Sequence, residues 1–508
     1  MSRTKNATRN IIWGFVNKVV MLLGPFNTRT VIIRYLGANY LGLGSLFNSI
    51  LHILNLTELG FASAVVFSLY KPIAENDTDS ICALMNLYRK IYRYIGGIIL
   101  TAGIGVMFFL PMIIKSDIPP DINLYSLYVI YLLNTVFSYW LFAYKSSLLI
   151  AHQRNDVTSN INTVGFSLQY VLQITFLIIT KNYYAYMILV LLFTIGRNIA
   201  ISVIVDRKYP DYKCRGDVSK EQINGIKKRV SGLFVQKICS ATRNTFDSIV
   251  ISAYLGLTIV GLYDNYFYII SAVHKLLDVI LVSIRSGIGN SIVLESKEKN
   301  FENFSLFNFM YSWISGVCAV CLVALTQTFM KIWVGSDYTF SNGIMMLFCV
   351  YFYSLTMIDI RTVYDDAAGI WWSQKYVVIV EAVLNIVLNF ILGKFFGVIG
   401  IVSATIISIV FVNFIAKTKY IFKLYFTEQK ISSYFLVHIK WVVLVVIASI
   451  IVWFSTSRIP LEGWPGFAVY GIIAFFVSNA TFVLFNFKNK YFKPSLRMMV
   501  RIKNIFKR

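Results

Sequence analysis

Charged residues are scarce in this chain of 508 residues, and acidic residues are the scarcest of them. Only 14% of the residues are charged, with 24 Asp and Glu against 47 Lys and Arg. A soluble protein of this size carries about 25% charged residues. This deficit excludes a soluble globular protein of ordinary composition. The GxxxxGK[ST] motif of P-loop nucleotide sites is also absent from the sequence, so ATP hydrolysis by such a site is not expected.

Cysteine is also rare, and its spacing predicts no disulfide framework. The chain has 6 Cys residues, of which Cys318 and Cys321 form a CxxC pair inside an apolar run. Neither a second cysteine pair nor a histidine lies near them in the sequence, so helix packing is favoured over metal or redox chemistry. We therefore expect no metal, no cofactor and no catalytic residues in this protein.

Long apolar runs are abundant in this chain. The chain is 57% hydrophobic, and its mean hydropathy is +0.66. Runs of about 20 apolar residues recur from one end to the other, which is typical of membrane-spanning helices. The sequence predicts an all-α integral membrane protein with fourteen spans, near residues 11–33, 40–68, 94–114, 124–150, 158–180, 183–205, 233–255, 260–284, 305–332, 343–368, 376–396, 398–416, 435–456 and 466–486.

Lysine and arginine are distributed unevenly between the two sides of this predicted bundle. The even-numbered connections and both tails hold roughly 31 Lys and Arg, against about 6 in the opposite loops. This bias predicts cytoplasmic N- and C-termini and a retained first helix rather than a signal peptide. The net charge of +23 is then explained by contacts with anionic lipid headgroups, so membrane lipids and not nucleic acid are the expected partners. All the predicted loops are too short for a soluble catalytic domain.

The opening of the chain is repeated 219 residues later without a gap. Ten identities fall within 29 positions, including YLG at 35–37 and again at 254–256. The shift spans six helices, an even number, which predicts two parallel six-helix lobes around a central cavity. The predicted domains are 1–215 for the N-lobe, 216–430 for the C-lobe, and 431–508 for two further helices with a basic tail. Two lobes around a cavity are typical of alternating-access transporters.

The first predicted span carries three cations and no acid. Lys18 and Arg29 are eleven residues apart, so they share one helical face about 16 Å apart, with Pro25 between them. A charge at the centre of a spanning helix costs about 2.5–3.5 kcal/mol on insertion scales. Intramembrane cations are therefore candidate functional groups. Arg29 is the deepest and is predicted to face a cavity, whereas snorkelling to headgroups is an alternative for Lys18 and Arg34.

Charged residues also occur in the seventh, eighth and eleventh spans. Lys237 repeats the place of Lys18, and Arg243 is spaced to form an i,i+4 ion pair with Asp247. Lys275 lies in a stripe of mixed sign in the eighth span, together with His274. The acids are candidate ion-coupling residues: Glu58, Asp264, Asp278 and Glu381.

Milder polar groups follow two other patterns. Rows of polar side chains at helical spacing either join helices or bind sugar hydroxyls. One row is Gln169 with Gln173, and the other is Glu381 with Asn385 and Asn389. A second group lies near the predicted cytoplasmic end of span 343–368 and is expected to neutralise itself at the membrane interface: Asp359, Arg361, Asp365 and Asp366.

Cations in excess on the first two helices predict an anionic ligand. In a medium of low dielectric constant, a cationic cavity favours a diphosphate or an acidic sugar, to which arginine can donate two hydrogen bonds at once. A cavity that exports cations would need the opposite sign. The candidate substrate-binding residues are Lys18, Arg29, Arg34, Lys237, Arg243 and Lys275.

The pattern resembles a known family, the polysaccharide flippases of the multidrug/oligosaccharidyl-lipid/polysaccharide (MOP) superfamily. The likeness rests on the fourteen predicted helices, the parallel repeat and the opening N-K-x(10)-R-x(4)-R-Y-L-G-x-x-x-x-G. It also rests on the segments LGLGSLFNSILHILNLTELGFASAVVFSLYKPIAEND and AGIWWSQKYVVIVEAVLNIVLNFILGKFFGVIGIVSATIIS. The resemblance covers essentially the whole chain and is distributed rather than confined to one motif.

The resemblance implies a transporter and not an enzyme. It implies translocation of undecaprenyl-diphosphate-linked oligosaccharide, an O-antigen or capsule repeat unit, across the bacterial plasma membrane. Polysaccharide polymerase and assembly proteins are further implied partners. By likeness to peptidoglycan-precursor flippases, Arg29 would hold the diphosphate, with Arg34 as a second match.

Two other functions fit part of the pattern. A drug or small-solute/cation antiporter of the same superfamily would share the fold but should line its cavity with acids. A membrane-bound glycosyltransferase or polymerase should carry a large loop with paired carboxylates, and the predicted outer loops are too short for one.

Overall fold

All regular secondary structure in the described part of the chain is helical. The computed structural model describes residues 3–55, 61–114, 118–224, 226, 245–370 and 373–497. The chain divides into two compact units, Met1–Gly261 (unit 1) and Leu262–Arg508 (unit 2). The predicted lobes 1–215 and 216–430 follow the sequence repeat, and their boundary stays a prediction.

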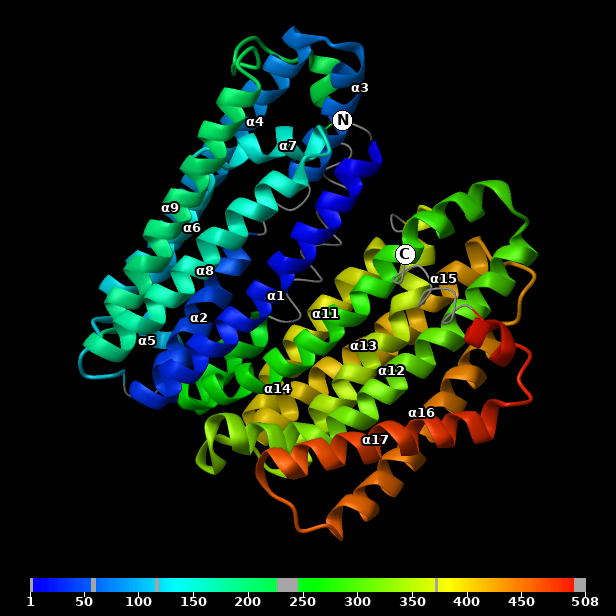
Figure 1. Ribbon diagram of the computed structural model, residues 1–508. Helices are drawn as coiled ribbons and strands as arrows, with labels where there is room; N and C mark the ends of the chain where they lie inside the picture. The colour runs from blue at the N-terminus through cyan, green and yellow to red at the C-terminus, as the bar shows by residue number, and fades with distance from the viewer. Residues whose placement is uncertain are drawn as a thin grey trace. The chain divides into compact units, whose positions relative to one another are not determined.

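Unit 1 contains the N-terminal helices (Figure 1). They are α1 (Arg3–Tyr35), α2 (Ala38–Leu54), α3 (Phe61–Glu75), α4 (Thr78–Met107), α5 (Leu110–Ile113), α6 (Leu124–Trp140), η2 (Ala143–Lys145), α7 (Ser146–Ala151), α8 (Asn155–Thr180) and α9 (Tyr183–Lys208). A shorter apolar helix covers Thr245–Leu255. The next helix, α11 (Leu257–Leu294), begins in unit 1 and continues in unit 2.

Unit 2 contains the remaining helices, with α16 and α17 packed on α12. They are α12 (Lys297–Val334), η3 (Ser336–Tyr338), α13 (Asn342–Ala367), α14 (Lys375–Ile407), the π-helix η5 (Ser408–Ala416), α15 (Lys417–Leu424), α16 (Ile431–Ser457) and α17 (Gly463–Asn486).

The structure is that of an all-α, multi-pass membrane protein. Within the described residues, 8 helices are long and apolar enough to cross a membrane, or 9 if α6 and the helix after its 43° bend form one span. The helices α1 and α4 are not among these 8 helices, so the predicted spans 11–33 and 94–114 stay predictions. Most of the predicted span 233–255 lies outside the described residues. The total of fourteen spans therefore stays a prediction.

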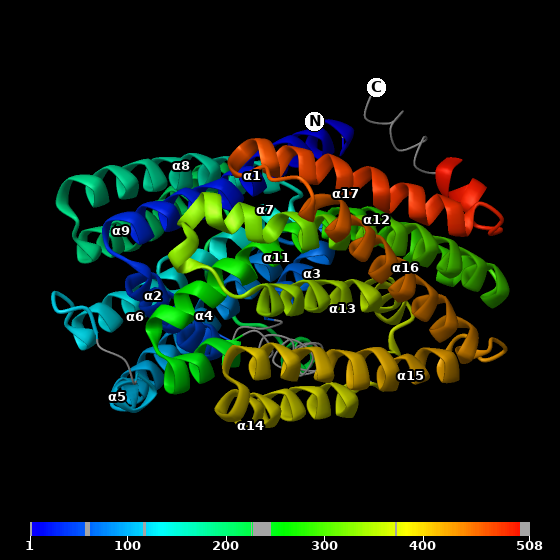
Figure 2. The same ribbon diagram turned by 90° about the horizontal axis from the view of Figure 1, so that it is seen from below.

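The chain reverses direction inside the long segment Lys375–Leu424. Gly397 has φ 58° and ψ −135°, a conformation that side chains with a Cβ avoid. Glu381 and Asn413 would be about 48 Å apart along a straight helix, yet Asn413 Nδ2 donates to Glu381 Oε2 over 2.8 Å. Asn385 Nδ2 likewise reaches Thr405 Oγ1 at 3.1 Å. Two antiparallel arms therefore meet at Gly397 (Figure 2), which confirms the predicted boundary between spans 376–396 and 398–416.

The sequence repeat has the same local geometry in both copies. The N–H of Gly37 donates to the carbonyl of Ile32 at 3.0 Å, and the N–H of Gly256 donates to the carbonyl of Ile251 at 3.1 Å. These four residues are pairs under the shift of 219. Each glycine has a positive φ, 110° and 91°. The matching turns direct α2 and α11 away from the helices that precede them.

The starts of α2 and α11 cross each other at two equivalent glycines of unit 1. A Cβ on Gly42 would lie 1.8 Å from the carbonyl oxygen of Leu257, and a Cβ on Gly261 would lie 2.5 Å from that of Ala38. Both contact pairs are related by the shift of 219. The crossing is therefore locally symmetric, and its backbones approach too closely for any side chain at these positions.

A pair of glycine substitutions tests this crossing. We expect Gly42→Ala to lower the free energy of unfolding by about 1–3 kcal/mol, because the new methyl group forces the two backbones apart. Gly97→Ala is the matched control: it lies within α4, and a Cβ there meets no atom within 4 Å. The control should gain up to about 1 kcal/mol from helix propensity. Thermal unfolding of each purified variant in detergent measures the effect, and equal shifts for both would contradict the close crossing.

Candidate functional site

The cations of α1 lie away from the face that packs on α8. Asn17 Nδ2 donates to Thr163 Oγ1 at 3.3 Å, and Gly24 lies against the ring of Tyr170. Helical periodicity places Lys18 and Arg29 about 100° around the helix from this contact. The cationic stripe is therefore not used to hold α1 against α8.

The three predicted cations of α1 differ in exposure. Arg29 is partly buried, whereas Lys18 and Arg34 are exposed. The exposed positions agree with snorkelling as well as with a water-filled cavity, so for Lys18 and Arg34 a binding role stays a prediction. Arg29 is the α1 cation whose surroundings the structure describes.

Two tyrosines of α9 are electrostatic neighbours of Arg29 in unit 1. Its guanidinium interacts electrostatically with Tyr183 and Tyr186 of α9. Tyr183 and Tyr131 hydrogen-bond through their hydroxyl oxygens at 2.9 Å, and Thr28 bonds to Tyr186. Guanidinium and phenol groups can all donate to an oxyanion. This part of α1 thus has the hydrogen-bonding chemistry of an anion site.

The other predicted substrate-binding residues are only partly placed. Lys237 and Arg243 lie outside the described residues, as does the candidate coupling acid Glu58. Lys275 is exposed on α11 in unit 2. Asp247, the predicted partner of Arg243, is almost completely buried, at 2% exposure. A site that joins these residues to Arg29 stays a prediction.

An acidic cluster occupies the interface of α11, α12 and α13 in unit 2. His274 Nε2 lies 3.1 Å from Asp359 Oδ2, and the Tyr311 hydroxyl donates to the same oxygen at 2.5 Å. Asp278 is close enough to interact electrostatically with His274 and Tyr311. Asp264 is a partly buried residue about three helical turns before His274 on α11. The predicted acid Asp278 thus lies near a histidine, an arrangement suited to proton-dependent behaviour.

Glu381 belongs to a buried ionic network between α13 and the two arms of the α14–α15 hairpin. Asn413 bridges two charges: its Oδ1 accepts from Arg361 Nη2 at 2.6 Å and its Nδ2 donates to Glu381 Oε2 at 2.8 Å. Arg361 also forms an ion pair with Asp365 at 3.5 Å, and Lys417 is buried nearby. Arg361 and Asp365 are 0% and 1% exposed. Arg361 and Asp365 therefore neutralise each other, as expected, in a site enclosed by helices, and the depth of this pair in the membrane stays a prediction.

Sequence reasoning missed Arg197, which lies at the junction of α8 and α9. Its Nη1 donates to Gln169 Oε1 at 2.6 Å, and its Nη2 donates to Thr194 Oγ1 at 3.3 Å. Its guanidinium lies 3.8 Å from the centroid of the Phe166 ring. The sequence could have identified Arg197 as a candidate, because it is the one charged residue of the predicted span 183–205. The amide row Gln169–Gln173 is its binding partner in the membrane (Gln169 Nε2 to Gln173 Oε1, 3.3 Å).

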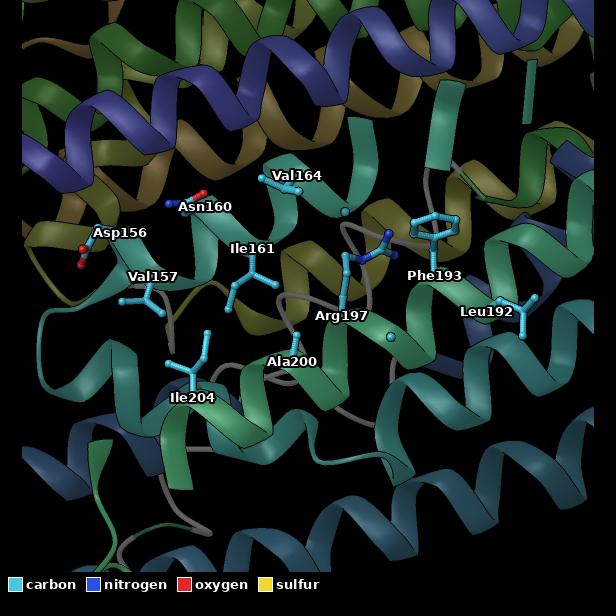
Figure 3. Close-up of a pocket in the computed structure, with 12 residues that line it drawn as sticks. Asp156, Val157, Asn160, Ile161, Val164, Leu192, Phe193, Arg197, Ala200 and Ile204 are labelled. Atoms are coloured by element: carbon cyan, nitrogen blue, oxygen red, sulfur yellow. The ribbon is translucent and has the colours of Figure 1, made fainter. Parts of the chain in front are cut away.

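A cavity of about 610 Å³ adjoins Arg197 between α8 and α9 (Figure 3). Its walls are mostly aliphatic, with polar groups at one end. The lining residues are Asp156, Val157, Asn160, Ile161, Val164, Gly165, Leu192, Phe193, Gly196, Arg197, Ala200 and Ile204.

The free thiols Cys318 and Cys321 line a different, apolar cavity of about 580 Å³ in unit 2. Groups of three or more His, Cys, Asp or Glu side chains able to hold a metal ion do not occur within the residues that the structure describes.

Comparison with known proteins finds similar folds among solved structures. No protein-family model and no curated protein sequence matches the chain. Among solved structures, it is similar to the lipid II flippase MurJ in an inward closed conformation, with TM-score 0.66 and 17% identity over 94% of this chain and 98% of that one. It is similar to an inward-facing multidrug-resistance MATE transporter, with TM-score 0.60 and 14% identity over 79% of this chain and 98% of that one.

A third similar structure is a MOP-superfamily transporter from Pyrococcus furiosus, described as having a binding pocket of reverse polarity that suggests a different function. Its TM-score is 0.51 at 12% identity, over 82% of this chain and 96% of that one. All three similar structures are transporters. This chain therefore shares the fold of these solved transporters.

Replacing Asn413 tests the buried network of unit 2. We expect Asn413→Leu to lower the free energy of unfolding by about 3 kcal/mol, because Arg361 and Glu381 each lose a charge-assisted hydrogen bond without access to water. Asn27→Leu is the control, since the exposed Asn27 bonds only within its own helix in the contacts described here, to the Leu23 carbonyl. The midpoint of thermal unfolding in detergent measures both variants, and an unchanged midpoint for Asn413→Leu would show that the bridge does not stabilise the fold.

Proposed function

We propose that this protein is a flippase for undecaprenyl-diphosphate-linked oligosaccharide repeat units of a bacterial surface polysaccharide. The observation that carries the proposal is the sign of the charge on α1. Arg29 is partly buried and interacts electrostatically with Tyr183 and Tyr186, on a helix whose described charges are all positive. An anionic headgroup is the cargo that this chemistry favours.

Fold similarity supports a lipid-linked cargo in preference to a drug. The lipid II flippase aligns with 94% of this chain at TM-score 0.66, and the MATE transporter aligns with 79% at TM-score 0.60. Both likenesses are distant in sequence, so the charge on α1 has to distinguish the two classes.

The polarity of the binding pocket varies among proteins with this fold. The sign of the charge in the pocket therefore helps to distinguish an anionic from a cationic cargo. The Pyrococcus furiosus transporter is described in terms of a binding pocket of reverse polarity. A cation or drug antiporter would need acids where α1 of this chain has Lys18, Arg29 and Arg34. These residues therefore support an anionic cargo over the antiporter, which remains the second candidate function.

In the proposed mechanism, the protein moves its cargo by alternating access and makes or breaks no bond. Arg29 replaces part of the water shell of the diphosphate with paired N–H donors, whose planar geometry fits two phosphate oxygens. The polyprenyl chain stays in the lipid. With both termini cytoplasmic, as the charge bias predicts, the headgroup leaves the cytoplasmic leaflet and reaches the outer one. The coupling role of Glu58, Asp264, Asp278 and Glu381 remains open to mutational test.

Substitution of Arg29 tests the proposal. In proteoliposomes that contain a fluorescent undecaprenyl-diphosphate oligosaccharide, we expect Arg29→Ala to slow flipping by about 10- to 100-fold, the value of one or two charge-assisted hydrogen bonds. Arg29→Lys should lose less, because it keeps the charge but not the paired geometry. Protection of the fluorophore from a membrane-impermeant quencher measures the rate.

The control is Arg458→Ala, since Arg458 is an exposed cation just after α16. It should flip at the wild-type rate. A fully active Arg29→Ala variant would remove Arg29 from the site. Transport of a cationic dye by the wild type, without transport of the diphosphate lipid, would support the antiporter and contradict the flippase.

A further inference from the structure

The cavity between α8 and α9 is an apolar groove along most of its length. Val157 and Ile161 of α8 lie opposite Ala200 and Ile204 of α9 (Figure 3). Its volume of about 610 Å³ lies within the usual range of ligand sites. At Gly196 the groove is open, because a Cβ there would meet no atom within 4 Å.

The groove is apolar next to Arg197, although this charged residue is one of its lining residues. The guanidinium of Arg197 turns away from Ile161 and Ala200 (Figure 3) toward Gln169 and the ring of Phe166. Only its side-chain stem is left to line the wall. The charge is thus bound by the protein itself and not presented to a ligand in the groove.

The length of the groove matches one leaflet of a membrane. The lining residues of α9 run from Leu192 to Ile204, about 18 Å along a helix. Half of the hydrocarbon thickness of a bilayer is about 15 Å. Leu192 is 55% exposed and Ile204 is 36% exposed, so their apolar surface needs a hydrocarbon partner in the membrane.

The end of this groove near Ile204 is polar and basic. Arg207 follows Ala200 and Ile204 at intervals of seven and three residues, which places it on the groove-lining face of α9. Arg207 and Lys208 form the basic last turn of the helix. The charge bias of the chain predicts that this end is cytoplasmic.

The acids at this end are already paired with other cations. Asp156 receives two hydrogen bonds from Arg154, at 2.8 and 3.1 Å, and Asp206 binds Lys145 Nζ at 2.5 Å. They therefore do not cancel the charge of Arg207. An apolar groove with a net positive charge at the membrane surface is complementary to an anionic amphiphile.

We propose that this groove binds one anionic phospholipid of the adjoining leaflet. One acyl chain lies between α8 and α9, along Ile161 and Ala200, and the phosphate lies at Arg207. A zwitterionic lipid of the same chain length fits the groove but gains less from Arg207, because its headgroup has no net charge. The site is separate from Arg29 and does not depend on which cargo the protein transports.

Native mass spectrometry of the purified chain in mild detergent tests the site. The probes are phosphatidylglycerol and phosphatidylcholine with identical acyl chains. We expect one phosphatidylglycerol to be retained per chain, more strongly than phosphatidylcholine. Gly196→Phe fills the groove and should weaken retention at least about tenfold, and Arg207→Gln should weaken it about fivefold for phosphatidylglycerol, the effect of one basic residue near a membrane surface.

Two matched variants control for general effects of the substitutions. Gly97→Phe places the same ring at another helical glycine with open space around it, and Lys423→Gln removes an exposed cation from the last turn of α15. Both should retain the lipid as the wild type does. Wild-type retention by Gly196→Phe, equal binding of the two lipids, or a lipid-free dimer of the wild type would each overturn the proposal.

Discussion

The cost of an unpaired charge in hydrocarbon determines how this protein can use its few ionic side chains. Where charges are buried among helices, the structure pairs them: Arg361 contacts Asp365 and, through Asn413, Glu381. Arg197 is likewise satisfied by an amide, a hydroxyl and an aromatic face. Such groups stabilise the bundle and have little capacity left for a ligand. Arg29 of α1 differs from these groups in its exposure, because it is only partly buried.

The fold of this protein does not by itself identify a function. The same transporter architecture accommodates proteins described as a lipid II flippase and as a multidrug transporter. Neither the helices nor their connections distinguish those two proteins. The proposed function of this chain therefore rests on the polarity of a small number of side chains, and the charged residues of α1 are all positive.

Helical periodicity was sufficient to predict the membrane class and the reversal near Gly397. Each of these depends on residues close together in the sequence. The partner of Arg197 and the bridge through Asn413 could not be predicted in the same way. Periodicity gives the face of a helix on which a residue lies, but it does not identify the helix opposite. The π-helix η5 also changes the faces of its residues, so regular α-helical spacing assigns Asn413 and Lys417 to the wrong neighbours.

The π-helix also determines which side chains after it face the interior. Its i→i+5 hydrogen bonds accommodate extra residues within the second arm of the hairpin. Winding the same residues with ordinary i→i+4 bonds would rotate everything that follows by about 100° for each extra residue. Lys417 would then leave the interior, and the balance of two cations against Asp365 and Glu381 would be lost. A local change of helix type, without any change of sequence, would here convert a neutral interior into an acidic one.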